Sequence, residues 1–234
     1  MKRSTRFLLL VIVGVACAPK PRPVGEVRAT APDRPLPFKV DRSEAEIRAF
    51  EAADRAAPPA PGGIVFFGSS SIRLWRSLAT DFPGLALVNR GFGGSTMPEA
   101  THYLPRVVLS HRPRTIVLYE GDNDLTFGWG PQRVAAEYVR FVQAVRDSLP
   151  GTRIVFMSVK PSPSRWHLAD QQRAVNRIVR EIAARDTLQT FVDVFTPMLG
   201  ANGRPRPELF LADSLHMTPA GYAVWRERLA PHLR

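Results

Sequence analysis

Serine, histidine and aspartate occur in this sequence in a pattern that could perform nucleophilic catalysis. Three consecutive serines, Ser69, Ser70 and Ser71, follow an apolar run, and Asp213 precedes His216 by three residues. A serine hydroxyl is a weak nucleophile that needs a base within hydrogen-bond reach. His216 can be that base, because the pKa of imidazole is about 6.5, and Asp213 can orient the ring. These residue types predict acyl transfer through a covalent serine intermediate.

Two further segments offer hydrogen-bond donors for the oxyanion of such a reaction. Gly94 lies in the segment NRGFGGS, where backbone N–H groups can approach a ligand closely because glycine has no side chain. Asn123, in EGDND, carries a side-chain amide. A tetrahedral intermediate needs donors of this kind. From the residues alone, any of the three serines could be the nucleophile, and they could equally cap a helix that begins near Ile72.

Five short apolar runs predict the strands that position these segments. They are nearly continuous in Ile, Val, Leu and Phe, as in parallel strands buried on both faces. The runs span residues 64–67, 85–88, 115–119, 153–159 and 190–194. Helical patterns fall between and after them, over residues 131–149 and 168–185, from Thr96 to about Leu109, and from Thr218 onward. Thr96 with Glu99 is predicted to form a capping box, and Thr218, followed by Pro219, is predicted to start the last helix.

The alternation of strands and helices predicts an α/β fold. We expect a three-layer α/β/α sandwich with a five-stranded parallel sheet in the flavodoxin-like order 2-1-3-4-5. Ligands bind such sheets beyond the carboxyl ends of the strands, where the segments above all fall. An additional helix near residues 43–57 precedes the first strand, and Ser43 with Glu46 is predicted to cap it. We interpret that helix as packing or cover, without a chemical role.

The first part of the chain predicts export. Residues 1–17 have a basic start, an apolar run and small residues before Cys17, the single cysteine. They resemble a bacterial lipoprotein signal, in which Cys17 would be lipidated, although Gly14 stands where leucine is usual; plain cleavage and secretion is the alternative. Residues 18–40 predict a proline-rich tether, and residues 41–234 the folded domain. We expect an envelope location, in the outer membrane or periplasm, or a secreted protein.

Charge and residue spacing exclude several other classes of function. The net charge is +11, but the arginines are spread over every segment, so we expect no nucleic-acid partner. No two histidines have metal-ligand spacing with carboxylates nearby, so we expect no metal and no cofactor.

Four motifs resemble the signature blocks of the SGNH hydrolases, also called the GDSL esterase/lipase family. FFGSSSIR, NRGFGGS, EGDND and DSLH occur in the order of the family, within about residues 62–232. The resemblance implies a triad of Ser70, His216 and Asp213. Ser69 stands where the family has aspartate, and we expect this to alter the neighbourhood of the nucleophile without abolishing activity.

The resemblance also implies an oxyanion hole, formed by the Ser70 backbone amide, Gly94 and Asn123. It predicts a serine esterase acting on a small-molecule or glycan ester with a small acyl or acetyl group. The candidate substrate contacts beyond the strand ends are Phe92, Trp129, Lys160, Arg165 and Trp166. The aromatic members of this set could equally close their loops against the core. An acyltransferase using the same triad and a non-catalytic glycan- or lipid-binding lipoprotein are the alternatives.

Overall fold

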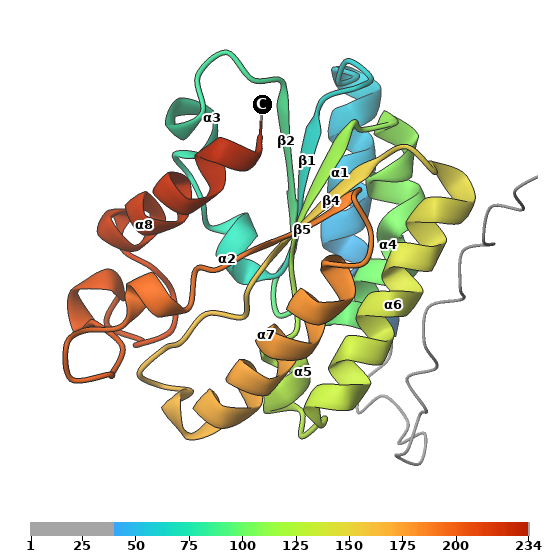
Figure 1. Cartoon of the computed structure of the whole chain (residues 1–234). Helices are drawn as coiled ribbons and strands as arrows, with labels where there is room; N and C mark the ends of the chain where they lie inside the picture. The colour runs from blue at the N-terminus through green and yellow to red at the C-terminus, as the bar shows by residue number, and fades with distance from the viewer. Residues whose placement is uncertain (1–39, 234) are drawn as a thin grey trace, which may run out of the picture.

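A parallel five-stranded sheet forms the centre of the molecule, as the computed structural model of residues 40–233 shows (Figure 1). Its order is β2-β1-β3-β4-β5, which confirms the predicted topology. The strands are β1 (Ile64–Gly68), β2 (Leu87–Gly91), β3 (Thr115–Tyr119), β4 (Arg153–Met157) and β5 (Gln189–Val192).

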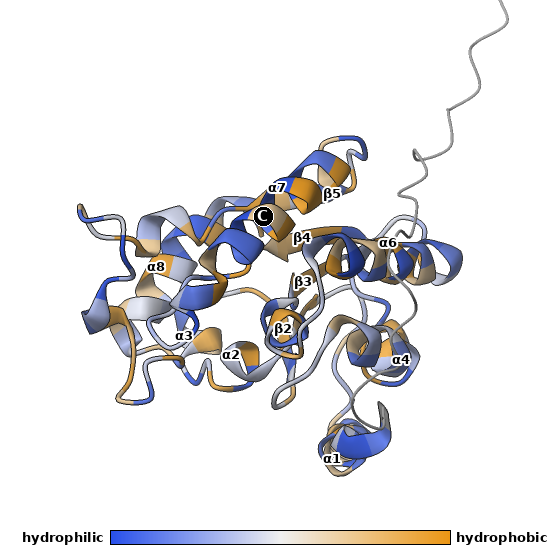
Figure 2. Ribbon diagram, turned by 90° about the horizontal axis from the view of Figure 1, so that it is seen from below, coloured by the Kyte–Doolittle hydropathy of each residue, from blue (hydrophilic) through white to orange (hydrophobic). Residues whose placement is uncertain are grey.

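Helices cover both faces of the sheet and complete the predicted three-layer sandwich. Helices α4, α6 and α7 lie on one face, with α1 packed outside against α4, and α2, α3 and α8 lie on the other (Figures 1 and 2). Their bounds are α1 (Glu44–Ala56), α2 (Ser70–Arg73), α3 (Leu78–Asp81), α4 (Met97–Val107), α5 (Asp122–Thr126), α6 (Pro131–Ser148), α7 (Ala169–Ala183) and α8 (Pro219–Leu229). Six short 3-10 turns join them: η1 (Val40–Ser43), η2 (Leu109–His111), η3 (Trp166–Leu168), η4 (Thr196–Met198), η5 (Pro207–Leu209) and η6 (Ala230–His232).

Alternate side chains of the inner strands enter two separate hydrophobic cores. In β1, Val65 and Phe67 join the core beneath α4 and α6, whereas Ile64 and Phe66 join the core beneath α3 and α8. β3 and β4 divide their side chains in the same way. Both faces are therefore apolar, which explains why these strands read as unbroken hydrophobic runs in the sequence.

The second strand begins and ends later than its sequence predicts. We expected it at residues 85–88, but β2 extends from Leu87 to Gly91, because Leu87 pairs with Ile64 and Gly91 with Gly68. The strand can include polar residues because their side chains have partners. Asn89 donates to the backbone oxygen of Ile72, and a neighbouring arginine forms an ion pair with α1.

Helix caps agree with the sequence in two cases of three. Thr96 and Glu99 form the predicted capping box of α4, and the Thr218 hydroxyl accepts from the Gly221 amide at the start of α8. Ser43 makes no side-chain cap bond at α1, which corrects that prediction.

The export signal, Cys17 and the tether up to residue 39 lie outside the described residues. Within residues 40–233, no helix is both long and apolar enough to cross a bilayer.

Candidate active site

Ser70 stands at the carboxyl end of β1, on a sharp turn from strand to helix. Gly68 makes this turn possible, since its φ is +135° and a Cβ atom there would lie 2.1 Å from the carbonyl oxygen of Tyr119. Ser70 is then the first residue of α2. Ser69 and Ser71 are buried, whereas Ser70 is only partly covered. The turn therefore presents one of the three serines toward the loop edge of the sheet.

A chain of hydrogen bonds joins Ser70 to His216 and Asp213. The distance from Ser70 Oγ to His216 Nε2 is 2.9 Å, and that from His216 Nδ1 to Asp213 Oδ2 is 2.6 Å. The structure thus brings together the three residues of the predicted triad, although Ser70 and His216 are 146 positions apart in the sequence. Among the three serines, it is Ser70 whose hydroxyl contacts the imidazole.

The turn that carries His216 also holds Asp213 in its charged form. Asp213 Oδ1 accepts hydrogen bonds from the backbone amides of Leu215 and His216, each 2.9 Å long. Burial raises the pKa of Asp213, but the hydrogen bonds from the His216 ring and from these amides outweigh it and lower the pKa to about 2. The carboxylate is therefore ionised at neutral pH, so that it accepts from Nδ1–H and leaves Nε2 free to accept the Ser70 proton.

Three candidate donors for an oxyanion occur in the loops that follow β1, β2 and β3. Gly68 pairs with Gly91 on one side and with Tyr119 on the other, so these loops begin at one level of the sheet. Within residues 40–233, the backbone amides of Ser70 and Gly94 donate to no other residue. Both amides remain available to a ligand.

Asn123 is held in one orientation by two neighbours. Its Nδ2 donates to the Ser95 carbonyl oxygen at 2.8 Å, and its Oδ1 accepts from Arg165 Nη2 at 2.9 Å. Because the amide oxygen faces Arg165, the NH2 group faces the Gly94–Ser95 loop, and one of its two hydrogens remains available. The predicted oxyanion donors therefore lie on neighbouring loops.

Two buried carboxyl groups, which sequence reasoning missed, join this loop to the start of α4. Burial raises the pKa of Glu120 well above its usual value, and its Oε1 accepts from the Ser95 hydroxyl. Burial also raises the pKa of Asp124 to about 7, and this side chain accepts from the Met97 amide at 3.1 Å. The available signal was the presence of Glu120 three positions before Asn123 and of Asp124 one position after it, but the sequence does not reveal that both are buried.

Lys160 and Arg165 belong to a buried ionic cluster with Asp122. Arg165 Nη1 lies 2.8 Å from Asp122 Oδ2, and Lys160 Nζ lies 3.7 Å from the same oxygen. Lys160 is 0% exposed, and burial lowers the pKa of its ammonium group. Lys160 is therefore not accessible for the substrate contact that we expected, while Arg165 contacts Asn123 instead.

The aromatic residues that we predicted to contact substrate instead pack largely against other parts of the protein. Phe92 is 0% exposed and packs against the rings of Phe67 and Tyr103. Trp129 is 3% exposed and lies under the Arg133 guanidinium. These two predictions are corrected, because both rings close loops against the core, which was the alternative interpretation.

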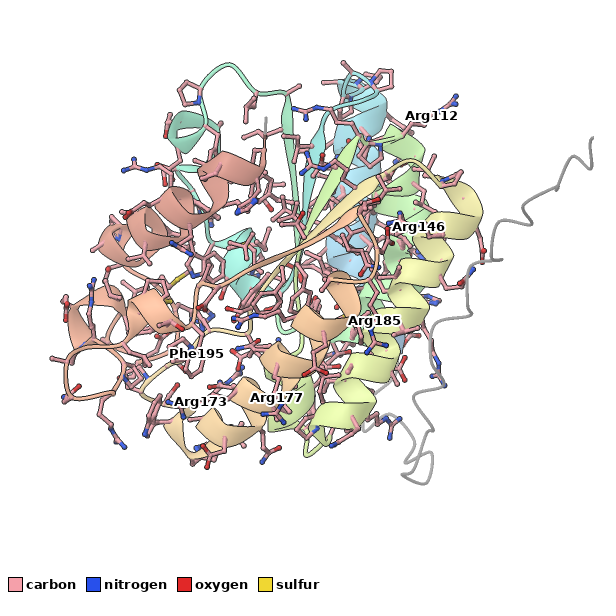
Figure 3. The ribbon with its side chains drawn as sticks, viewed as in Figure 1. Arg112, Arg146, Arg173, Arg177, Arg185 and Phe195 are labelled. Carbon is pink, nitrogen blue, oxygen red and sulfur yellow. The ribbon has the colours of Figure 1, made fainter. Side chains whose placement is uncertain are left out.

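Trp166 remains half-buried near the edge of the sheet. The guanidinium groups of Arg173 and Arg204 lie 5.2 and 5.1 Å from its ring centroid. The Arg173 guanidinium in turn lies 5.0 Å from the ring centroid of Phe195 (Figure 3). Cations already pack on this tryptophan, so it offers less free surface than the sequence indicated.

No group of three or more His, Cys, Asp or Glu side chains in the described part of the chain is arranged to hold a metal ion.

Comparison with known proteins gives a family match and similar folds. The model of the GDSL-like lipase/acylhydrolase family matches residues 63–224. A comparison with curated proteins gives no significant match. Among solved structures, a Streptococcus pneumonia protein whose description refers to platelet activating factor has a TM-score of 0.74 at 21% identity, over 83% of this chain and 94% of that chain.

Two further solved structures have the same fold. A GDSL-like lipase from Bacteroides thetaiotaomicron has a TM-score of 0.68 at 19% identity, over 81% of this chain and 97% of that chain. A catalytic mutant of an acetylxylan esterase from Geobacillus stearothermophilus has a TM-score of 0.60 at 16% identity, over 74% and 95%. At these identities the likeness concerns the fold.

Proposed function

Because the chain belongs to the GDSL-like lipase/acylhydrolase family, we propose that it hydrolyses carboxylic esters with Ser70 as nucleophile. The observation that carries this proposal is the hydrogen-bond chain from Asp213 through His216 to Ser70. A serine at the end of such a chain has the base that it needs for attack.

The reaction follows from the roles that these atoms can take. Ser70 Oγ attacks the ester carbonyl carbon while His216 Nε2 accepts the hydroxyl proton. The carbonyl oxygen becomes an oxyanion, which the amides of Ser70 and Gly94 and the Asn123 side chain stabilise. The C–O bond to the alcohol then breaks, and His216 returns the proton to the leaving oxygen.

The second half of the reaction releases the acid. Water attacks the acyl-enzyme as His216 accepts one of its protons, and the collapse of this second intermediate returns the proton to Ser70 Oγ. Asp213 remains ionised throughout and stabilises the imidazolium at each step.

We propose that the preferred substrates carry a short acyl group, such as acetyl, which is released as the free acid. One structural neighbour is an acetylxylan esterase, which supports an acetylated glycan as a substrate class. The aromatic side chains Phe92 and Trp129, which could have lined a long acyl channel, are instead packed in the core.

Hydrolysis of p-nitrophenyl esters from acetyl to octanoyl tests this proposal. We expect turnover that is highest for acetyl and that falls by at least about 10³-fold in Ser70→Ala. Ser71→Ala is the matched control, because Ser71 follows Ser70 on the same helix but is buried and has no contact with His216. Equal turnover in Ser70→Ala and the wild-type protein would contradict the proposal.

We also propose that the protein is exported and anchored through Cys17, as residues 1–17 predict. Metabolic labelling with palmitate should label the wild-type chain and not Cys17→Ser. Secretion of an unlabelled wild-type chain would instead favour simple cleavage.

A further inference from the structure

Helix α1 reaches the loop that carries Gly94, although it lies outside the residues that match the family model. Its first turn and the preceding η1 direct two charged side chains, Arg42 and Glu46, toward this loop. Glu46, which we predicted to cap α1, is used for this contact instead. No sequence pattern predicts this contact, because Glu46 and Gly93 are 47 positions apart.

Glu46 joins the Gly94 loop to the helix that begins with Ser70. Its Oε2 accepts from the Gly93 amide at 3.0 Å, and its Oε1 accepts from Arg73 Nη1 at 3.1 Å. Arg73 is the last residue of α2. One carboxylate therefore links the loop that carries Gly94 to the helix that carries Ser70, and each of these segments holds a proposed oxyanion donor.

Arg42 fixes the same loop from the other side of Gly94. Its Nη2 donates to the Gly94 carbonyl oxygen at 2.6 Å, and its Nε and Nη2 each lie 2.7 Å from the carboxylate of Glu99. Glu99 is fully buried and also accepts from the Thr96 amide in the capping box of α4. A buried carboxylate needs a cation, and here the cation reaches the loop as well.

These contacts bracket the peptide bond that carries the proposed donor. The Gly93 amide and the Gly94 carbonyl lie on either side of the planar Gly93–Gly94 peptide, so fixing both restricts how that plane can turn. The restriction is needed, because consecutive glycines have the greatest backbone freedom. Gly94 has a φ of +67°, and nothing lies within 4 Å of the position of a Cβ atom.

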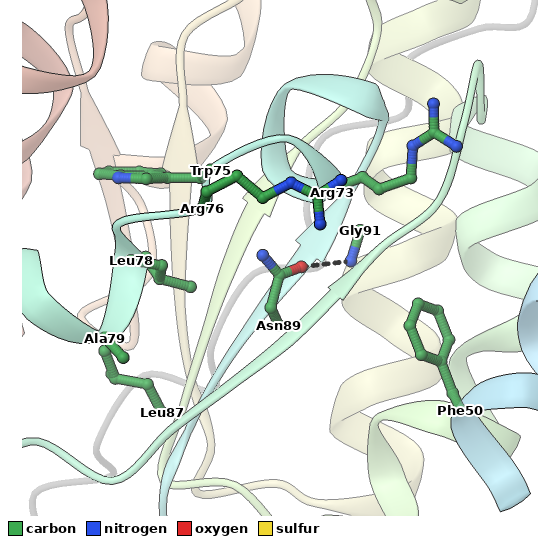
Figure 4. Close-up of a pocket in the computed structure, with 9 residues that line it drawn as sticks. All are labelled: Phe50, Arg73, Trp75, Arg76, Leu78, Ala79, Leu87, Asn89 and Gly91. Atoms are coloured by element: carbon green, nitrogen blue, oxygen red, sulfur yellow. Dashed lines mark hydrogen bonds between the residues drawn. The ribbon is translucent and has the colours of Figure 1, made fainter. Parts of the chain in front are cut away.

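The base of the loop is fixed independently. The Gly91 amide donates to Asn89 Oδ1 at 2.9 Å (Figure 4), and a Cβ at Gly91 would lie 2.1 Å from the Arg73 backbone nitrogen. Helix α2 therefore rests directly on the end of β2. A groove of about 400 Å³ is lined by Arg73 of α2, the segment that leads into α3, β2 and Phe50 of α1, and neither Ser70 nor His216 borders it (Figure 4).

We propose that Arg42 and Glu46 are positioning residues, which hold the Gly93–Gly94 peptide so that the Gly94 amide faces the oxyanion. Helix α1 then has a positioning role in addition to the packing that we predicted for it, which is against α4. This inference rests on the proposed ester hydrolysis. An oxyanion donor that is misplaced by a fraction of an ångström loses much of its effect on the transition state while substrate binding changes little.

Arg106 provides a matched control within the same helix packing. Like Arg42, it is about one-third exposed, and it forms ion pairs with two carboxylates, those of Glu44 and Glu51 on α1. It therefore ties α1 to α4 without touching the Gly94 loop. Arg106→Ala removes these ion pairs between α1 and α4 but leaves the side chains of Arg42 and Glu46 intact.

The experiment compares Arg42→Ala, Glu46→Ala, Glu46→Gln and Arg106→Ala in the full chain, with p-nitrophenyl acetate as substrate. We expect kcat to fall about 10- to 100-fold in the first two, with KM within about twofold of the wild-type value. Glu46→Gln should recover part of this loss, because its amide oxygen can still accept from Gly93. Arg106→Ala should keep kcat within about twofold.

Amide hydrogen exchange of Gly93 gives a second measurement that does not need turnover. Exchange should accelerate in Glu46→Ala, whose side chain is exposed enough that the fold survives its loss, and not in Arg106→Ala. Unchanged kcat and exchange in Glu46→Ala, or equal losses in all variants, would overturn the inference. Accelerated exchange in Glu46→Ala, together with a wild-type protein that turns over no ester, would support the positioning of this loop and refute the proposed hydrolysis.

Discussion

The buried carboxyl group of Asp124 makes the stability of this protein depend on pH in a calculable way. Burial raises its pKa from the usual 3.8 to about 7. The folded protein therefore keeps a proton that the unfolded chain has lost across this interval. Since the unfolded state binds fewer protons, the free energy of unfolding decreases as pH rises from about 4 to about 7 and levels off above that.

The size of this effect follows from the difference between the two pKa values. About three pH units at about 1.4 kcal/mol each give roughly 4 kcal/mol between pH 4 and pH 8. Asp124→Asn removes the titration while its amide oxygen can still accept from the Met97 amide. The variant should therefore be as stable as the wild-type protein near pH 4 and more stable by up to about 4 kcal/mol at pH 8.

Urea unfolding of both proteins at each pH unit from 4 to 9 measures the difference. Taking the difference between the two curves cancels, to first order, the titrating groups that do not interact with Asp124. Parallel curves across this range would show that Asp124 ionises normally in the folded state, and would refute the argument from burial.

Three further predictions concern the site itself. Arg165→Met should lower kcat about 10- to 100-fold with little change in KM, because Asn123 Oδ1 loses the partner that orients its amide; Arg173→Met is the control, and equal effects of both would contradict this role. Gly68→Ala should lower the free energy of unfolding, measured in urea, by roughly 2–5 kcal/mol. The new methyl group would collide with the Tyr119 carbonyl oxygen of β3, and alanine would have to adopt the positive φ of Gly68. The acidic limb of log(kcat/KM) should have a slope of one, since a carboxylate with a pKa of about 2 at Asp213 leaves a single proton to titrate; a slope of two would show a second group.

The fold was predictable because its signals are local. Unbroken apolar runs such as Thr115–Tyr119 arise from burial on both faces of the sheet, and the capping residue Thr96 lies beside the helix that it begins. The end of β2 was misplaced, because Asn89 and Arg90 read as loop residues until their partners are known.

The site was predictable only where a motif carries the information. Ser70 could be chosen among three serines by resemblance, and the structure adds the contact with His216. Burial depends on residues distant in the chain, so neither the enclosed position of Lys160 nor that of Phe92 could be read from the sequence. The same holds for the contact of Arg42 with Gly94, which spans 52 positions.

The hydrogen bond between Ser70 and His216 joins residues that are 146 positions apart. Synthesis proceeds from the N-terminus, so the serine is made long before its base. The elements on either side of His216 in the sequence are β5, which pairs with β4, and α8, which packs against the sheet. On the proposed mechanism, a nascent chain has no complete triad until the segment with Asp213 and His216 has been made and folded, so hydrolysis can begin only once the last part of the domain is in place.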